Sequence, residues 1–250
     1  MKKRIDVLLV ERGLAESRQK AQALLLAGQV IVGGQKVDKP GRMVSVEDQI
    51  RLLAKLPYAS RAGGKLQAAL DHFRIDVGGR VCADMGASTG GFTDCLLQRG
   101  AREVHTFDVG KGLLDWKLRS DLRVCVHDEY NVRNIAASDL PDDLSLVTVD
   151  LSFISLTKIL VNLRNALELK CAGRPVDLVL LVKPQFEVGK GEVGKGGIVR
   201  DIDKRDAALD RVVQHAVGSG FTAIGSIPSP IRGSKGNAEF LLYLRFAPGL

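Results

Sequence analysis

The sequence predicts an α/β protein in which a doubly wound, mostly parallel sheet follows a small N-terminal α+β module. The first observation is that, beyond about residue 60, short apolar runs typical of buried strands alternate with segments of helical periodicity. The second is charge: the chain carries a net +7, and residues 1–60 hold eleven Lys or Arg against six Asp or Glu. This concentrated basic excess favours an anionic partner, nucleic acid before a membrane surface.

The N-terminal quarter shows two short helical patterns and then strand patterns separated by turns. Ser17 can cap the second helix and Gly28 can end it, while the glycine pair in QVIVGGQKV indicates a hairpin. Arg18 and Lys20 fall near the positive N-terminal end of that helix, which suits a phosphate oxygen. A solvated basic helix face is the alternative for each residue.

A linker is predicted between the two modules. In PYASRAGG, a proline, a serine and two glycines interrupt the periodic pattern before helical spacing resumes at Leu66. We therefore expect one domain over residues 1–58 and a second over residues 59–250, with residues 59–64 as the linker.

Polar side chains stand at the ends of five predicted strands. The carboxyl ends of parallel strands lie at one edge of the sheet, where ligands bind. Because a buried charge is costly unless it is paired, five such residues are difficult to explain as stabilising features. We expect a functional site that contains Asp84, Asp108, Asp128, Asp150 and Lys183.

The glycine-rich segment DMGASTGGFTD follows the first of these strands. Gly86, Gly90 and Gly91 let the backbone turn tightly and approach a ligand. The segment lacks the Gly-Lys-[Ser/Thr] of a P-loop and does not match GxGxxG. Asp108 lies where a ribose-binding carboxylate belongs, so the combination favours a cofactor that contains adenosine.

Other site classes are poorly supported. Cys82, Cys95, Cys125 and Cys171 lie far apart without a CxxC pair, and the four histidines form no metal-like cluster, so we expect neither zinc nor disulfides. The sequence has no run of about 18 apolar residues. The apolar run behind the basic start is four residues long, so we expect no signal peptide and a cytoplasmic protein.

Longer motifs carry a family resemblance. Six segments, in order, resemble the TlyA/hemolysin-A family of S4-linked RNA methyltransferases and, more distantly, the FtsJ-like ribose 2'-O-methyltransferases. They are DMGASTGGFTD, FDVGKGLLDWKLR, NVRNI, VDLSFISL, LLVKPQFEVGKGEVGKGGIVRD and SPIRGSKGNAEFL. The N-terminal pattern, from RID and SR to GQVIV and KP, resembles the S4 RNA-binding module. The resemblance covers essentially the whole chain and implies a Rossmann-like class I methyltransferase with a seven-stranded sheet whose last strand is antiparallel.

The resemblance also implies ligands. It implies S-adenosylmethionine as cofactor, with Asp108 on its ribose and Asp128 beside its adenine, although many relatives have Glu and Arg in place of Asp128 and Glu129. Gly86, Ser88 and Gly90 would flank its methionine portion, and Asp84, Gly91 and Phe92 are further residues implied to bind the cofactor. The S4 module implies contacts to structured RNA by shape and phosphate, for which Arg4, Arg18 and Lys20 are candidates.

FtsJ-like enzymes use a Lys-Asp-Lys-Glu tetrad, which matches Lys65, Asp150, Lys183 and Glu239. Lys183 would lie beside the target 2'-hydroxyl, either as a neutral base or as a cation that stabilises the alkoxide. Asp150 and Glu239 would orient it, and Lys65 would position the ribose or a phosphate. A lysine that merely caps a strand is the alternative.

We therefore expect an S-adenosylmethionine-dependent 2'-O-methyltransferase that modifies ribosomal RNA, with cytidine as the nucleotide that the resemblance suggests. Its partners would be ribosomal RNA or ribosomal subunits, without stable membrane association. Two alternatives belong to other classes: a membrane-active hemolysin-like protein, and a ribosome assembly factor that binds RNA without catalysis.

Overall fold

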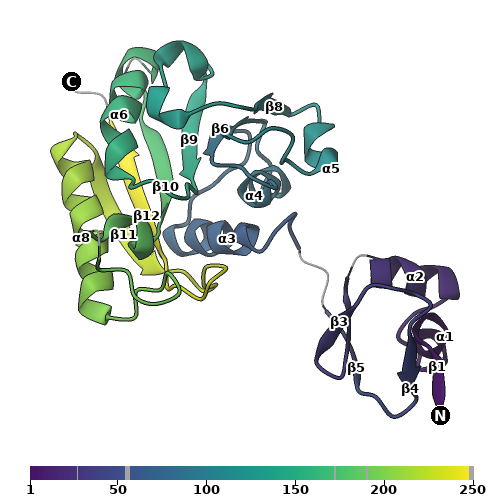
Figure 1. The fold of residues 1–250 in the computed structure, drawn as a ribbon. Coiled ribbons are helices and arrows are strands. Elements are labelled where there is room, and N and C mark those ends of the chain that lie inside the picture. Colours follow the sequence, from purple (N-terminus) through teal and green to yellow (C-terminus); the bar gives the residue numbers. More distant parts are fainter. Residues whose placement is uncertain (27, 54–56, 172, 190, 248–250) are drawn as a thin grey trace. The chain divides into compact units, whose positions relative to one another are not determined.

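The computed structural model describes residues 1–26, 28–53, 57–171, 173–189 and 191–247. It divides into two compact units, Met1–Leu56 and Pro57–Leu250, each described here by itself. Figure 1 shows the elements of both units.

The first unit is a small α+β fold. Its elements are β1 (Lys2–Arg4), α1 (Ile5–Glu11), α2 (Arg18–Leu26), β2 (Val30–Val32), β3 (Gln35–Val37), β4 (Met43–Ser45) and β5 (Ile50–Leu52). Ser17 accepts a hydrogen bond from the Lys20 N–H at the start of α2, as expected of a cap. The strands form the antiparallel pair β1–β4 and the three-stranded sheet β3–β2–β5, in which β2 and β3 are the predicted hairpin.

The second unit begins differently from the linker expected at residues 59–64, because helix α3 (Ala62–Phe73) starts within that segment. The Ala59 N–H donates to the Asp94 carboxylate at 2.7 Å, which ties the segment to the following helix. A Cβ at Gly63 would lie 2.4 Å from the ring of Tyr58. Gly63 therefore serves close packing at this point.

A seven-stranded sheet forms the centre of the second unit. Its strands are β6 (Val81–Met85), β7 (Glu103–Phe107), β8 (Val124–His127), β9 (Leu144–Val149), β10 (Val176–Val182), β11 (Thr222–Pro228) and β12 (Phe240–Phe246). They lie in the order β11-β12-β10-β9-β6-β7-β8, and β12 runs antiparallel to both of its neighbours. The predicted mostly parallel sheet with an antiparallel last strand is confirmed.

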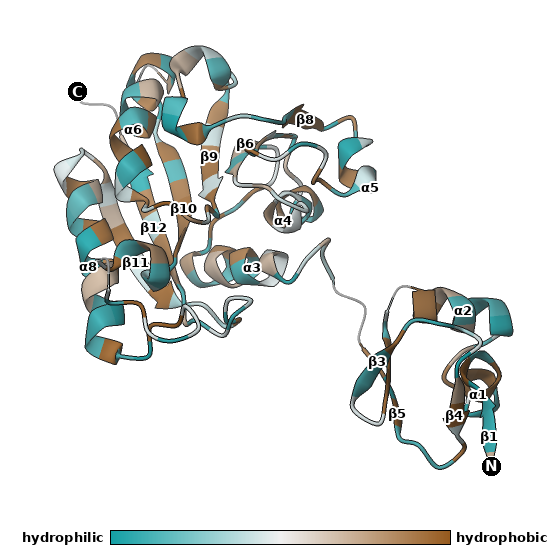
Figure 2. Ribbon diagram, in the orientation of Figure 1, coloured by the Kyte–Doolittle hydropathy of each residue, from teal (hydrophilic) through white to brown (hydrophobic). Residues whose placement is uncertain are grey.

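Helices cover both faces of this sheet (Figure 1). They are α3, α4 (Gly91–Gln98), α5 (Trp116–Arg119), α6 (Thr157–Cys171), α7 (Pro184–Glu187) and α8 (Ile202–Gly218), with 3-10 turns η1 (Val132–Asn134) and η2 (Ala137–Asp139). Alternate residues of β10 enter two different apolar clusters: Leu178 and Leu180 pack with α6 and α8 residues, Val179 and Leu181 with α3 and α4 residues. β10 is buried along its whole length and is mostly brown in Figure 2, which explains its continuous apolar run.

Candidate active site

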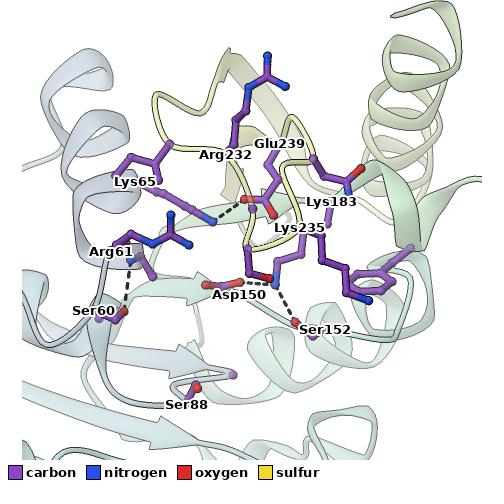
Figure 3. A pocket seen from close by; sticks show the side chains of 18 of the residues that line it. Ser60, Arg61, Lys65, Ser88, Asp150, Ser152, Lys183, Arg232, Lys235 and Glu239 are labelled. Carbon is purple, nitrogen blue, oxygen red and sulfur yellow. Dashed lines mark hydrogen bonds and ion pairs between the residues drawn. The ribbon is translucent and has the colours of Figure 1, made fainter. Parts of the chain in front are cut away.

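A cavity of about 520 Å³ lies at the carboxyl ends of β6, β9 and β10. Its walls come from the start of α3, the loops after these three strands, and the segment 231–239 that leads into β12. Figure 3 shows the side chains that point into it. This is the sheet edge at which the strand-end residues were expected to form a site.

Lys183 lies between β10 and α7, and Pro184 ends the strand and begins the helix. Its Nζ lies 2.6 Å from Asp150 Oδ1, just after β9, and donates to Ser152 Oγ at 2.9 Å (Figure 3). Only 11% of the Lys183 side chain is exposed. The ammonium is therefore held in one place by two acceptors, with limited access to water.

A second ion pair faces the same cavity. Lys65 Nζ, from α3, lies 2.5 Å from Glu239 Oε2, and the two side chains are 9% and 3% exposed. Glu239 directly precedes β12, and because this strand is antiparallel to β10, its first residues lie at the same sheet edge as Lys183. The structure thus brings together all four predicted tetrad residues, which come from four separate parts of the sequence.

The charge of the cavity lining is strongly positive. Five cationic side chains line it against two carboxylates; the cations are Arg61, Lys65, Lys183, Arg232 and Lys235, and the carboxylates are Asp150 and Glu239. Arg61, Arg232 and Lys235 were not named from the sequence, although Arg232 and Lys235 belong to the segment SPIRGSKGNAEFL, which carried the resemblance. The excess suits a polyanionic substrate.

Phe153 lies at the cavity and is 88% exposed, which is unusual for a phenylalanine. Its φ of +65° lies in the left-handed region, which non-glycine residues rarely adopt. Its ring centroid is 5.3 Å from that of Phe186, in a tilted arrangement. An exposed ring held by a strained backbone beside Lys183 offers a surface on which a base can stack.

The glycine-rich loop after β6 forms another wall of the cavity. A Cβ at Gly86 would lie 2.5 Å from the Asp150 carbonyl oxygen, and one at Gly90 would lie 2.2 Å from Leu118. Both glycines have positive φ, as has Ser88 at +48°. Gly91 also admits no side chain, since a Cβ there would lie 2.2 Å from Ser60 Oγ. The exposed Ser88 and Thr89 thus present backbone directly to the cavity.

Asp108 and Asp128 follow β7 and β8, and neither is among the described residues that line the cavity. Asp108 accepts hydrogen bonds from the N–H groups of Ser88 and Gly110, both at 2.8 Å. It is therefore fixed against the end of the glycine loop. Asp128 accepts a hydrogen bond from Arg119, and this bond lowers the pKa of the Asp128 carboxyl. Asp128 also accepts a hydrogen bond from the Gly112 N–H.

Asp84 occupies a different environment from the other strand-end residues. It lies inside β6, is 0% exposed, and accepts hydrogen bonds from Thr93 Oγ1 at 2.6 Å and Thr148 Oγ1 at 2.9 Å. Burial raises the pKa of Asp84 to about 6, against the effect of the two hydroxyl donors. Its carboxyl faces α4 and ties together β6, β9 and the helix beyond the glycine loop, whose Phe92 is also buried.

The candidate RNA contacts lie in the first unit. Arg4 and Arg18 both donate to the carboxylate of Asp6, which is 0% exposed, at distances of 2.9 to 3.0 Å. The hydrogen bond from Arg4, with those from Arg18 and Gln22, holds the pKa of Asp6 well below its usual range. Lys20 is exposed. Asp6 thus fixes the two arginines side by side while leaving about half of each side chain accessible.

Two of the four histidines lie in contact in the structure. His105 Nδ1 lies 3.2 Å from His127 Nε2 on the neighbouring strand. The parallel register of β7 and β8 pairs His105 with Cys125 and Phe107 with His127, which the spacing in the sequence does not reveal.

Comparison with known proteins places the two units in families. Residues 58–246 match the FtsJ-like methyltransferase family, and residues 3–50 match the S4 domain. The 16S/23S rRNA (cytidine-2'-O)-methyltransferase TlyA of Mycobacterium tuberculosis is 45% identical over 244 residues, which cover 97% of this chain and 89% of that protein. Hemolysin A of Brachyspira hyodysenteriae is 41% identical over 244 residues, which cover 96% of this chain and 98% of that protein.

A solved structure from Streptococcus thermophilus, 42% identical, superposes with a TM-score of 0.74 over 99% of this chain and 90% of its own. An S-adenosylmethionine dependent methyltransferase from Mesorhizobium loti shares the fold at 15% identity, with a TM-score of 0.50 over 72% of this chain and 97% of its own.

Proposed function

Because the chain belongs to the FtsJ-like methyltransferase family and carries an S4 domain, we propose that it methylates the ribose 2'-oxygen of a cytidine in ribosomal RNA. S-adenosylmethionine would be the methyl donor. The observation that supports this most directly is the presence of two lysine–carboxylate pairs in one cationic cavity, Lys183 with Asp150 and Lys65 with Glu239. The TlyA relative is named for the same activity.

Lys183 is the central residue of the proposed mechanism. An ammonium has three donors; one goes to Ser152 and Asp150 lies 2.6 Å away as an ion-pair partner, so a donor remains for the ribose 2'-oxygen. A hydrogen bond to that oxygen stabilises the negative charge that develops as the methyl group is transferred and the hydroxyl proton passes to solvent. Asp150 and Ser152 act by holding the ammonium in position.

Lys65 and Glu239 have a positioning role in this mechanism. Their ion pair is nearly buried, so Lys65 presents a fixed positive charge at the start of α3, next to the exposed Arg61. We assign Lys65 and Arg61 to the ribose and its neighbouring phosphate. Arg232 and Lys235, in the segment that leads to Glu239, would hold the phosphates that follow.

The loop after β6 fits the proposed cofactor. Side chains at Gly86 and Gly90 would collide with Asp150 and Leu118, so glycine at both positions lets the loop pack tightly against these residues beside the cavity. When bound, S-adenosylmethionine supplies an electrophilic methyl group on a sulfonium. Gly86, Ser88 and Gly90 would flank its methionine portion, with Asp108 on its ribose and Asp128 near its adenine.

The first unit, which we assign to RNA binding within residues 1–58, would add affinity for structured RNA. Arg4 and Arg18, fixed by Asp6, and the exposed Lys20 are the proposed phosphate contacts. Ribosomal RNA as substrate places the protein in the cytoplasm.

The test is incubation with radiolabelled S-adenosylmethionine and either unmodified ribosomal subunits or protein-free ribosomal RNA, followed by alkaline digestion. A 2'-O-methyl group removes the nucleophile that alkali needs, so label in alkali-resistant dinucleotides is the expected result. Lys183→Ala should reduce kcat by about 10²–10³-fold with unchanged cofactor binding, while Lys158→Ala, an exposed lysine on α6, should match the wild type. Label in ordinary mononucleotides would show base methylation and contradict the proposal.

Membrane lysis is a second candidate, on the ground that one relative is named hemolysin A. Every helix in the described part of the chain is too short or too polar to cross a membrane. Leakage of anionic liposomes at physiological salt, unaffected by Lys183→Ala, would support this candidate over methyl transfer.

A further inference from the structure

The β7–β8 end of the sheet has a face that receives little cover from helices. Helices α6 and α8 contribute to the apolar cluster on this face, together with residues from β9, β10 and β12. From β8 to β9 the chain passes through residues 128–143, whose helical elements are the short turns η1 and η2. On this face Glu103, His105, Cys125 and His127 are half-buried, whereas Phe107 at the end of β7 is buried.

Four groups that can bind metals meet on this face. Glu103 and His105 alternate along β7, and Cys125 and His127 alternate along β8. Because alternate residues of a strand share a face and the two strands are in parallel register, the four side chains form one cluster. Glu103 opens β7, so the cluster lies toward the end of the strand opposite Asp108.

The distances within the cluster single out three ligands. Glu103 Oε1 lies 2.7 Å from His105 Nε2 and 3.4 Å from Cys125 Sγ. One ligand atom from each of these three residues lies within 4.8 Å of those of the other two. His105 Nδ1 lies 3.2 Å from His127 Nε2, so His127 can accept a hydrogen bond from the protonated Nδ1. Histidines that bind metals usually donate their other nitrogen to such a partner, which fixes the ring and its tautomer.

We propose that Glu103, His105 and Cys125 bind a zinc ion, with a water molecule as the fourth ligand. A thiolate, an imidazole and a carboxylate are the three ligand types that zinc takes in proteins. The alternative is a hydrogen-bonded polar cluster at a half-buried sheet edge. That alternative accounts for the two hydrogen bonds to Glu103, and the metal titration below separates it from a zinc site.

Binding requires small and specific changes. Cys125 must lose its thiol proton to solvent as the sulfur–zinc bond forms. His105 Nε2, which donates to Glu103 in the metal-free protein, must give up its proton, and His105 then carries its proton on Nδ1, where it donates to His127. Zinc bond lengths in a tetrahedral site imply ligand–ligand separations of roughly 3.3–3.6 Å. The Glu103–His105 contact of 2.7 Å must therefore lengthen slightly, and any two ligand atoms that lie up to 4.8 Å apart must come closer. Rotation of side chains at a partly exposed sheet edge allows both changes.

Zinc at this position would cross-link the edge strand β8 to β7. The three proposed ligands are not among the residues assigned to the cavity or to the cofactor, although His127 directly precedes Asp128. The test of the zinc site needs neither RNA nor cofactor, so its failure would leave the proposed function unaffected.

The test uses the untagged full-length chain after chelator treatment, titrated with Co²⁺ as a spectroscopic probe and then with Zn²⁺ as competitor. We expect one Co²⁺ per chain, a thiolate-to-cobalt charge-transfer band, and its loss when Zn²⁺ is added. Cys125→Ser should abolish the band and weaken binding at least about 10-fold, and His127→Ala should weaken binding by roughly 10–100-fold while keeping the band. His72→Gln, at an exposed position on α3, is the matched control.

Zn²⁺ should also raise the melting temperature of the wild type and not that of Cys125→Ser, because only a folded site binds it. Circular dichroism of each variant checks that it is folded. Absence of stoichiometric binding, or a charge-transfer band that persists in Cys125→Ser, would overturn the assignment.

Discussion

Replacement of Lys65 by methionine should separate the structural role of the Lys65–Glu239 pair from its proposed role with RNA. Lys65→Met leaves the Glu239 carboxylate, which is only 3% exposed, without its cation at 2.5 Å. Breaking a buried pair from one side costs about 3–5 kcal/mol. For a unit of 150–250 residues this corresponds to a fall in melting temperature of roughly 6–20 °C.

The double variant Lys65→Met/Glu239→Gln removes both charges, so it should recover most of this loss and lie within about 2 kcal/mol of the wild type. Neither variant should methylate RNA. Urea unfolding followed by circular dichroism measures the stabilities, with separate transitions fitted for the two units because they can unfold independently. Lys158→Met is the control. If Lys65→Met is as stable as the wild type, or if the double variant is as unstable as the single one, Lys65 does not stabilise the buried carboxylate of Glu239.

Three further predictions concern residues outside this pair. The raised pKa of Asp84, about 6, means that the contribution of Asp84 to stability falls by about 3 kcal/mol as pH rises from about 4 to about 6, so the stability difference between wild type and Asp84→Asn should change by about that amount; parallel stability curves over that range would contradict it. Phe153→Ala should change the free energy of unfolding by less than about 0.5 kcal/mol, because the ring is exposed. It should lower kcat/KM for RNA roughly 5–100-fold, because a base loses its stacking surface. An unchanged kcat/KM would exclude stacking of a base on Phe153. The lowered pKa of Asp6 predicts that the first unit loses stability as pH falls below about 4. Asp6→Asn should therefore destabilise this unit by roughly 1–3 kcal/mol at pH 7 and flatten its acid dependence. Thermal unfolding at pH 7 and below about pH 4 measures both effects, and unchanged stability of Asp6→Asn would contradict the prediction.

The sheet and the tetrad could be predicted because their signals are either local or carried by long motifs. The continuous apolar run before Lys183 marks a strand buried on both faces, and the residue after such a strand lies at the sheet edge. Lys65 and Glu239 could be paired only through the family motif, since 174 positions separate them and no local pattern links them.

Other features depend on register and on side-chain direction. Asp84 was grouped with the strand-end residues, but β6 extends one residue further, so this side chain faces α4 and the interior. The partnership of Arg4 and Arg18 with Asp6 depends on how α1 and α2 pack together. His105 and His127 meet because of the offset between β7 and β8, and strand offsets are set by the whole sheet rather than by either strand.

Strand β12 enters the sheet between β10 and β11 and pairs with β10 along seven residues, although it is the last strand in chain order. During synthesis β10 emerges from the ribosome dozens of residues before β12, so the growing chain carries an open sheet edge and no Glu239. The cavity can be completed only when the final strand has been made and inserted. A nascent chain therefore cannot form the Lys65–Glu239 pair, and any activity that needs this pair begins only after translation has passed residue 239.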